Sequence, residues 1–331
     1  MTSKATRYLH SKSGYYFESC DSDTFWDSEL AASPQDNIFL RSSYMRASGL
    51  DKHRYFIKLN DDIVGGITLV PKVNRIQLNY ATYQGLWLKK ANISNYRDDL
   101  KILESIQNVA EIIEFNKIET NLSLHWSLID MRGFEWAFLN SNNMSINFKP
   151  RYTGILDLTD PQGLAGILLR MRKVRQQEFN RNYNLTINDD FNDRVLEEFL
   201  GLYSETLRLT SNAQDLLLLN RVAELTTSSI RANTGQLFSA RGSDRQPLAF
   251  ILLQDDGNVG YYQFAARSRT AANIPATSKL VFTIIQELIS KNRSSLDFVG
   301  MNSPARGEYK ASFNARPGLY FDVATKNKSQ S

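Results

Sequence analysis

The chain has 331 residues, of which 42% are hydrophobic, and a formal net charge of +4 at pH 7. This length predicts two domains, each large enough to bury a core. The slight positive charge favours an anionic ligand, but it is far below the excess that is typical of nucleic-acid-binding proteins. The single cysteine, Cys20, excludes an intramolecular disulfide. No apolar run reaches the roughly 18 residues of a membrane-spanning helix, and the polar N-terminus lacks a secretory core, so we expect a cytoplasmic protein.

The first half alternates extended and helical patterns. Residues 54–70 form two apolar runs around the turn Asn60–Asp62, which predicts a hairpin. Gly65 and Gly66, inside the second run, predict a bulge or a close backbone approach. Apolar residues recur at spacings of three and four over 98–116, which predicts a helix, and a strand is expected after it. This order is typical of a mixed α/β domain.

A polar and aromatic segment, residues 80–87, lies between the hairpin and that helix. It places Tyr83, Gln84 and Trp87 around Gly85. We interpret these three side chains as candidate substrate-binding residues on a pocket wall. The alternative is that they are ordinary half-buried residues at the end of a strand.

A change of composition at Lys149-Pro150 predicts the domain boundary, with one domain over 1–149 and a second over 150–331. The second domain is expected to open with a short strand at 155–158 and a helix whose last turns, 170–181, are rich in arginine and lysine. This cationic strip could contact phosphate. The alternative is a solvated helix face.

The rest of the second half predicts a sheet with one helix before its last strand. Strands are expected at 237–241, 247–254 and 258–266, followed by a helix at 274–290 and a strand at 296–299. A late apolar run, 319–323, predicts a final strand that returns to the first domain.

The most informative segment follows that helix. It contains Asp297-Phe298 and Gly300, then a spacer, then Lys310 and Phe313. This order resembles the C-terminal signature of the Fem-type transferases, roughly Asp-Phe-x-Gly followed by Phe-Lys-x-x-Phe-Gly. Two positions depart from it, because Tyr309 replaces the first Phe of the second half and Asn314 replaces its Gly. Asparagine tolerates a positive φ better than most residues, so we expect the turn to survive.

The resemblance implies two tandem GNAT-like (N-acyltransferase) domains of α/β class, with mixed sheets and a cleft between them. It also implies acyl transfer, and a basic helix near the cleft in which Lys173 and Arg175 are the candidates for binding phosphate. GNAT domains usually hold coenzyme A with a glycine-bearing loop at a helix N-terminus. The corresponding segment here, 267–275, has no glycine, although Arg267 and Arg269 supply charge. The acyl donor is therefore left open.

The sequence contains no paired-carboxylate motif, no metal-ligand spacing and no nucleophile elbow. The three histidines, His10, His53 and His125, all lie in the first half. The reaction that requires the fewest specialised catalytic residues is direct acyl transfer to an amine, with no metal. The expected roles are proton donation by Tyr309 or Tyr262, stabilisation of charge by Lys310, and orientation by Asn302 or Gln263. We expect the Lys310 ammonium to point into the cleft beside the strand ends, and its replacement by Met to leave the melting temperature nearly unchanged.

The predicted function is an N-acyltransferase that moves an acyl group from acyl-coenzyme A or acyl carrier protein to the amine of a small anionic acceptor. An amino-sugar nucleotide or an amino acid conjugate would fit, in cell-envelope or polysaccharide biosynthesis. Two alternatives stay open: transfer from aminoacyl-tRNA, as in the peptidoglycan-bridge Fem enzymes, and a non-catalytic GNAT-like binding module. A monomer or weak dimer is expected.

Overall fold

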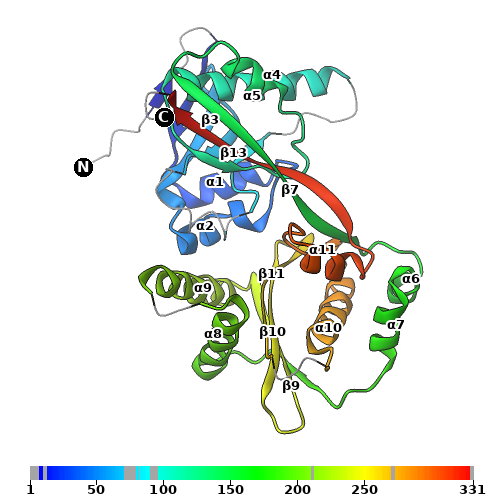
Figure 1. Cartoon of the computed structure of the whole chain (residues 1–331). Coiled ribbons are helices and arrows are strands. Elements are labelled where there is room, and N and C mark those ends of the chain that lie inside the picture. The colour runs from blue at the N-terminus through cyan, green and yellow to red at the C-terminus, as the bar shows by residue number, and fades with distance from the viewer. Residues whose placement is uncertain are drawn as a thin grey trace. The chain divides into compact units, whose positions relative to one another are not determined.

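The computed structural model describes residues 7–9, 13–70, 80, 82–89, 96–209, 212–269 and 273–328. The chain divides into two compact units (Figure 1). Unit 1 comprises Met1–Arg151 and Leu319–Ser331, and unit 2 comprises Tyr152–Gly318. Both units mix helices with strands, which confirms the predicted fold class. Among the described residues, no helix is both long and apolar enough to cross a membrane.

Unit 1 is built on a sheet of short strands with helices packed against it. Its strands β1 to β5 follow one another in that order, and β6 and β7 flank β13. The strands are β1 (Arg7–Leu9), β2 (Tyr15–Ser19), β3 (Arg54–Leu59), β4 (Asp62–Thr68), β5 (Leu86–Leu88), β6 (Asn121–Ser123), β7 (Met144–Asp157) and β13 (Arg316–Asn327). The helices are α1 (Asp23–Leu30), η1 (Ile38–Leu40), α2 (Ser42–Ser48), η2 (Asp51–His53), α4 (Tyr96–Phe115) and α5 (Arg132–Phe138).

The predicted hairpin is confirmed as β3 and β4, with Asn60 and Asp61 at positive φ in the turn. Ile57 pairs with Gly65 but Lys58 pairs with Ile63, so the extra residue bulges beside the glycines. A Cβ atom at Gly65 would lie 2.4 Å from the carbonyl oxygen of Trp87. The glycines are therefore required because β5 approaches β4 closely.

The last strand, β13, takes part in the core of unit 1. Asp322–Ala324 pair antiparallel with Asn121–Ser123 of β6, and Val323 is buried at 1% exposure. The hydroxyl of Thr325 donates to the carbonyl of Ile118 at 2.7 Å and accepts from the amide of Thr120 at 3.0 Å. A segment from the end of the chain thus completes a sheet that was begun some 200 residues earlier, as the separation of 205 positions between Thr120 and Thr325 shows.

Unit 2 is a sheet in the order β7-β12-β11-β10-β9-β8 with helices on both faces. Its strands after β7 are β8 (Thr186–Asn188), β9 (Gly235–Arg241), β10 (Pro247–Asp255), β11 (Val259–Arg267) and β12 (Ser295–Asp297). Its helices are α6 (Gly163–Arg170), α7 (Lys173–Asn180), α8 (Asp193–Leu207), α9 (Ala213–Arg231), α10 (Ala276–Ser290) and α11 (Pro304–Ala311).

Two sequence predictions in this region are wrong. The strand expected at 155–158 begins at Met144, so the Lys149-Pro150 step lies inside a strand and not between elements. The single basic helix is two helices, because Met171 takes an extended conformation and buries its side chain at 3% exposure. Helical spacing continues across Met171, but anchoring that side chain in the core requires the chain to turn there.

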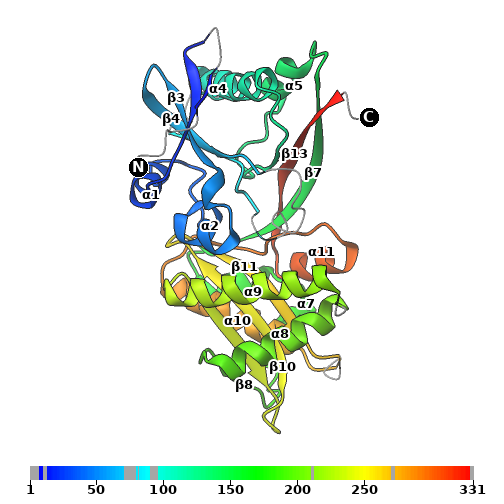
Figure 2. The ribbon, with the colours of Figure 1, turned by 90° about the vertical axis from the view of Figure 1, so that its left-hand side faces the viewer.

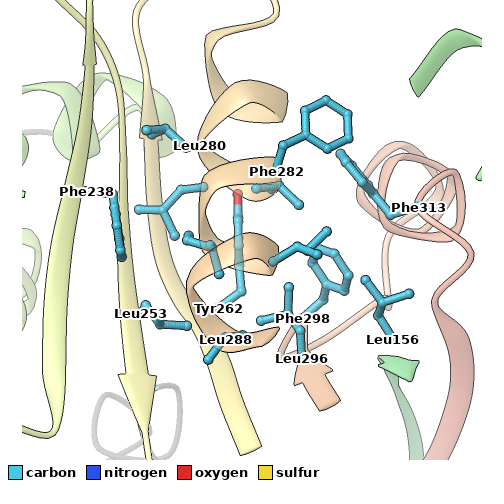
Figure 3. Close-up of a cluster of buried hydrophobic side chains, with 14 of the residues drawn as sticks. Leu156, Phe238, Leu253, Tyr262, Leu280, Phe282, Leu288, Leu296, Phe298 and Phe313 are labelled. Atoms are coloured by element: carbon cyan, nitrogen blue, oxygen red, sulfur yellow. The ribbon is translucent and has the colours of Figure 1, made fainter. Parts of the chain in front are cut away.

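Helices α8 and α9 cover one face of strands β9 to β11, and α10 covers the other (Figures 1 and 2). On the α8 face, Phe199 packs against Phe250 and Tyr203 packs against Phe264. On the α10 face, a larger apolar core gathers residues from α10, β10, β12 and α11 (Figure 3). Phe298 and Phe313, both from the C-terminal signature, are fully buried in that core.

Candidate functional site

A cavity of about 460 Å³ lies in unit 2 where β11 and β12 part. The parallel register of these strands ends at Tyr261 opposite Asp297, whereas β11 continues to Arg267. The cavity is lined by residues of α8, β11, α10 and α11: Tyr203, Thr206, Leu207, Tyr262, Gln263, Phe264, Ala265, Ala266, Arg267, Thr277, Val299, Ala305, Arg306, Tyr309 and Lys310. Five of the residues predicted from sequence, Tyr262, Gln263, Arg267, Tyr309 and Lys310, meet here.

A β-bulge at Gln263 shapes this cavity. Leu252 pairs with Phe264 and Leu253 with Tyr262, so Gln263 is the extra residue of β11. A bulge breaks the alternation of side chains along a strand. As a result Tyr262 joins the core on the α10 face, whereas Phe264 packs against Tyr203 on the α8 face. The cavity wall therefore includes side chains from both faces of the sheet.

Lys310 is buried at 7% exposure, and its ammonium group faces backbone oxygens. Its Nζ atom donates to the carbonyls of Phe298 and Gly300, each at 2.6 Å, and lies 5.5 Å from the ring centroid of Tyr262. Burial lowers the pKa of Lys310 to about 8, although nearby Asp297 opposes the shift. The side chain is thus a buried cation on the cavity wall.

Two tyrosines of the cavity wall hold their protons firmly. Burial raises the pKa of Tyr309 to about 12, with the Ser278 hydroxyl and Arg175 opposing the rise. Burial also raises the pKa of Tyr262 well above its usual range. Tyr309 lies 5.3 Å from Phe313, centroid to centroid, which confirms that the two share one side of the segment. Both phenols are protonated at neutral pH and are available as donors.

The edge of the cavity is polar and positively charged. Arg267 ends β11, where its backbone amide donates to the Thr206 hydroxyl at 3.0 Å. The side-chain oxygen of Gln263 accepts from Gln254 at 2.9 Å. Part of the glycine-free segment after Arg267, residues 270–272, lies outside the described residues. Among the described residues that line the cavity there are three cations, Arg267, Arg306 and Lys310, and no carboxylate.

Four candidates of unit 2 do not line the cavity. Asn302 binds both backbone groups of Tyr152, with its oxygen 2.8 Å from the amide and its nitrogen 3.1 Å from the carbonyl. Arg269 donates to the carbonyl of Glu205 at 3.1 Å. Lys173 is exposed on α7, whereas the Arg175 side chain is enclosed between α7, α10 and α11. The structure gives Asn302 and Arg175 contacts that hold elements together.

The three candidates of unit 1 are fully buried. Tyr83 packs edge-on against Phe39, His125 and Tyr320, and Trp87 does so against Trp26 and Phe56. Gln84 has 0% exposure, and neither its amide nitrogen nor its amide oxygen has a hydrogen-bond partner among the described residues. Their placement corresponds to the alternative of packed residues near a strand end.

Sequence reasoning missed several residues of the cavity wall, notably Tyr203, Thr206, Thr277 and Arg306. Tyr203 lies on the buried side of an amphipathic helix, where periodicity predicts core packing and nothing more, and Thr206 is exposed near the end of that helix. Thr277 begins α10, and Arg306 lies inside the C-terminal signature, four residues before Lys310. That helical spacing was the one available signal, since it places Arg306 and Lys310 on the same side of α11.

Comparison with known proteins bears on unit 2 first. Residues 169–311 match the family model described as "Acetyltransferase (GNAT) domain". Every residue that lines the cavity lies inside this range. No curated protein matches the chain.

Solved structures extend the likeness to nearly the whole chain. FemX is similar with a TM-score of 0.60 and 12% identity, over 91% of this chain and 96% of FemX. A conserved protein of unknown function from Bacteroides thetaiotaomicron VPI-5482 has a TM-score of 0.58 and 10% identity, over 94% and 99% of the two chains. At such identities the likeness concerns the fold, which is that of FemX in both units.

Proposed function

We propose that this protein, whose residues 169–311 match the GNAT domain model, is an acyltransferase that transfers an acyl group from an activated donor to an amine at the cavity of unit 2. The observation that carries the proposal is the position of Lys310 and Tyr309. One supplies a buried cation and the other a protonated phenol, side by side in sequence on one cavity wall. Both belong to the signature that resembles the Fem-type transferases.

The reaction needs charge stabilisation and one proton transfer. The amine nitrogen attacks the acyl carbon, and the carbonyl oxygen becomes negative. The Lys310 ammonium, charged below its pKa of about 8, stabilises that oxygen. The bond from the acyl carbon to the sulfur or oxygen of the donor then breaks. Tyr309 donates its proton to the leaving atom and recovers one from the amine, so protons balance over the cycle.

The cations of the cavity favour a donor or an acceptor that carries phosphate or carboxylate. Arg267 and Arg306 lie at the wall, and no carboxylate lines it among the described residues. The basic segment 170–181 supports an anionic ligand less than the sequence suggested, because three of its arginines already form ion pairs. Arg170 pairs with Asp160, Arg172 with Glu308, and Arg175 with Glu178. A small anionic amine, such as an amino-sugar nucleotide or an amino acid conjugate, fits this charge.

Two donor classes compete for this site. The fold of FemX, together with the C-terminal signature, favours an aminoacyl-tRNA, the donor implied by the peptidoglycan-bridge Fem enzymes. The GNAT family model fits an acyl thioester of coenzyme A or of a carrier protein. We rank the aminoacyl-tRNA first, because the likeness to FemX covers both units and the family model covers part of unit 2.

A donor screen tests the proposal. The purified protein is incubated with acetyl-coenzyme A, acyl carrier protein thioester and aminoacyl-tRNA in parallel, with a panel of anionic amines, and products are identified by mass spectrometry. We expect amide formation that falls by about a hundredfold in Tyr309→Phe and in Lys310→Met. Transfer from the thioesters and not from aminoacyl-tRNA would place acyl thioesters first among the donors. Binding without transfer from any of the three would overturn the proposal and favour a binding module.

A further inference from the structure

Three hydroxyl groups in the cavity wall have no hydrogen-bond partner among the described residues: those of Tyr203, Tyr262 and Thr277. Tyr203 and Tyr262 are more than nine-tenths buried, with 8% and 7% exposure, and the Thr277 hydroxyl oxygen is also buried. The Thr277 oxygen is shut off from solvent without a partner, whereas the two phenol oxygens are open to the cavity. Roughly 90% of buried polar groups in folded proteins are paired, so the Thr277 hydroxyl requires a partner. A bound ligand can supply that partner.

The three hydroxyls come from three different elements and are held by packing. The ring of Tyr203, from α8, lies 5.8 Å from Phe264, and the ring of Tyr262, from β11, lies 5.7 Å from Phe298 (Figure 3). Thr277 is in the first turn of α10. Because these contacts fix the two rings, the phenol hydroxyls of Tyr203 and Tyr262 are presented in set positions.

One charged group lies near both tyrosines. Burial raises the pKa of Tyr203 and of Tyr262, and the Arg306 guanidinium opposes the rise in each. Arg306 lines the same cavity as both phenols. The remaining wall includes Leu207, Ala265 and Val299. The wall therefore combines apolar side chains for a carbon skeleton with hydroxyls for its polar substituents.

We infer that Tyr203, Tyr262 and Thr277 are specificity-determining residues that select an acyl group bearing a hydroxyl or amino substituent over its alkyl isostere. The inference rests on the proposed function. An alkyl substituent in this part of the cavity displaces water and leaves the hydroxyls without partners, whereas a polar one pairs with them. Sites that hydrogen-bond a substrate group discriminate strongly against analogues that lack it, so we expect a preference on the order of a hundredfold or more.

The first experiment compares three acyl groups of equal size on one donor molecule: lactyl, alanyl and isobutyryl. They differ in a single substituent, which is hydroxyl, amino or methyl. The donor is whichever of the three classes supports transfer, and kcat/KM is measured for each acyl group. We expect lactyl and alanyl to exceed isobutyryl by about a hundredfold. Equal values for the three would overturn the inference while leaving the proposed acyl transfer intact.

The second experiment assigns the preference to the hydroxyls. Tyr203→Phe and Thr277→Val remove one hydroxyl each with little change of shape. We expect each to lower the ratio of lactyl to isobutyryl kcat/KM by about tenfold. An unchanged ratio in both variants would overturn the assignment. Tyr262→Phe is less informative, because that ring also lies beside Lys310.

The third readout needs no donor. A hydroxyl without a protein partner contributes little to the stability of the free protein, so Tyr203→Phe and Thr277→Val should leave the melting temperature unchanged or raise it. Tyr261→Phe is the matched control, since the hydroxyl of Tyr261 donates to Asp256 at 2.7 Å. We expect this control to melt lower. A loss in Tyr203→Phe as large as that of the control would overturn the inference even if no donor supported transfer.

Discussion

The guanidinium carbon of Arg175 lies 4.8 Å from the centroid of the Tyr309 ring. The same group donates to Ser312 and to Ser278, each at 2.7 Å, and forms an ion pair with Glu178. One largely buried side chain thereby ties α7 to α10 and α11. The contact helps to hold Tyr309 in the cavity wall, because it joins the eight-residue helix α11 and the residue after it to α7 and α10.

Replacement of Arg175 by Met should destabilise unit 2 and lower turnover. It leaves Glu178 without its partner and removes the cation from the Tyr309 ring. Removing one partner of a buried ion pair typically costs about 3 kcal/mol, which chemical denaturation measures. Lys173→Met is the matched control, since Lys173 is an exposed cation on the same helix, and we expect it to cost less than about 0.5 kcal/mol. Equal stability of the two variants would contradict the role of Arg175.

The charge of Lys310 predicts a pH dependence of activity. Burial lowers the pKa of Lys310 to about 8, so the side chain is a charged ammonium below that pH and a neutral amine above it. If the charge stabilises the developing oxyanion, kcat should fall as pH rises through about 8. The measurement is the pH profile of turnover in the wild type and in Lys310→Met. We expect the variant to be slow and to lack that alkaline limb, and a limb of equal size in both would refute the assignment.

The same group predicts a pH dependence of stability with a definite sign. The folded pKa of about 8 lies below the unfolded value of 10.5, so between these values the unfolded state binds more protons. The wild type should therefore gain stability as pH rises from about 8 towards 10.5, whereas Lys310→Met should not. Urea denaturation measures this change. Between pH 7 and pH 9.5, the free energy of unfolding of the wild type should rise by about 2 kcal/mol relative to that of Lys310→Met. Parallel behaviour of the two proteins would contradict this.

Asn314 follows α11 with a φ of +67°, which is the left-handed region expected for the position where related signatures carry glycine. Asn314→Gly should be neutral within about 0.5 kcal/mol, because glycine adopts this conformation freely. Asn314→Ala should lose about 1 kcal/mol, because its Cβ is strained there. Denaturant midpoints of the three proteins test the order. An Ala variant as stable as the Gly variant would show that the turn has relaxed.

Removal of residues 319–331 should destabilise unit 1. The truncated chain loses the pairing of β13 with β6, including the hydrogen bond from the Leu124 amide to the Phe321 carbonyl at 2.9 Å. Hydrogen exchange of the Leu124 amide should accelerate strongly. Thr325→Val is a milder companion that removes the bonds to Ile118 and Thr120, and it should cost about 1–2 kcal/mol. Wild-type protection in the truncated protein would show that β13 is dispensable.

Local backbone conformation could be predicted from the sequence wherever interactions within a short segment determine it. The β3–β4 hairpin follows from an Asn-Asp turn between apolar runs, and the glycines at its bulge were recognisable because a side chain there has no room. Asn314 was identified as the residue able to replace glycine, and it has the expected positive φ. In these cases the decisive interactions lie within a few residues of each other.

Long-range packing decided the features that the sequence mispredicted. Helical periodicity runs through Met171, but the core takes up its side chain and the helix divides into α6 and α7. The sequence marked Lys310 by its signature, yet its burial depends on carbonyl groups presented by the chain after β12. Neither outcome follows from spacing, because each depends on partners from another element.

The sequence by itself determined the α/β class of the protein, most of its strands and helices, and the signature that contains Tyr309 and Lys310. Only the tertiary structure decided which of the candidate residues share a cavity. The bulge at Gln263 turns Tyr262 and Phe264 to opposite faces of the sheet, and β12 ends opposite Tyr261 whereas β11 continues to Arg267. Tyr203 of α8 and Thr277 of α10 line the cavity beside this part of β11. The hydrogen-bond register between two strands depends on both strands, so it cannot be predicted from the sequence of either strand alone.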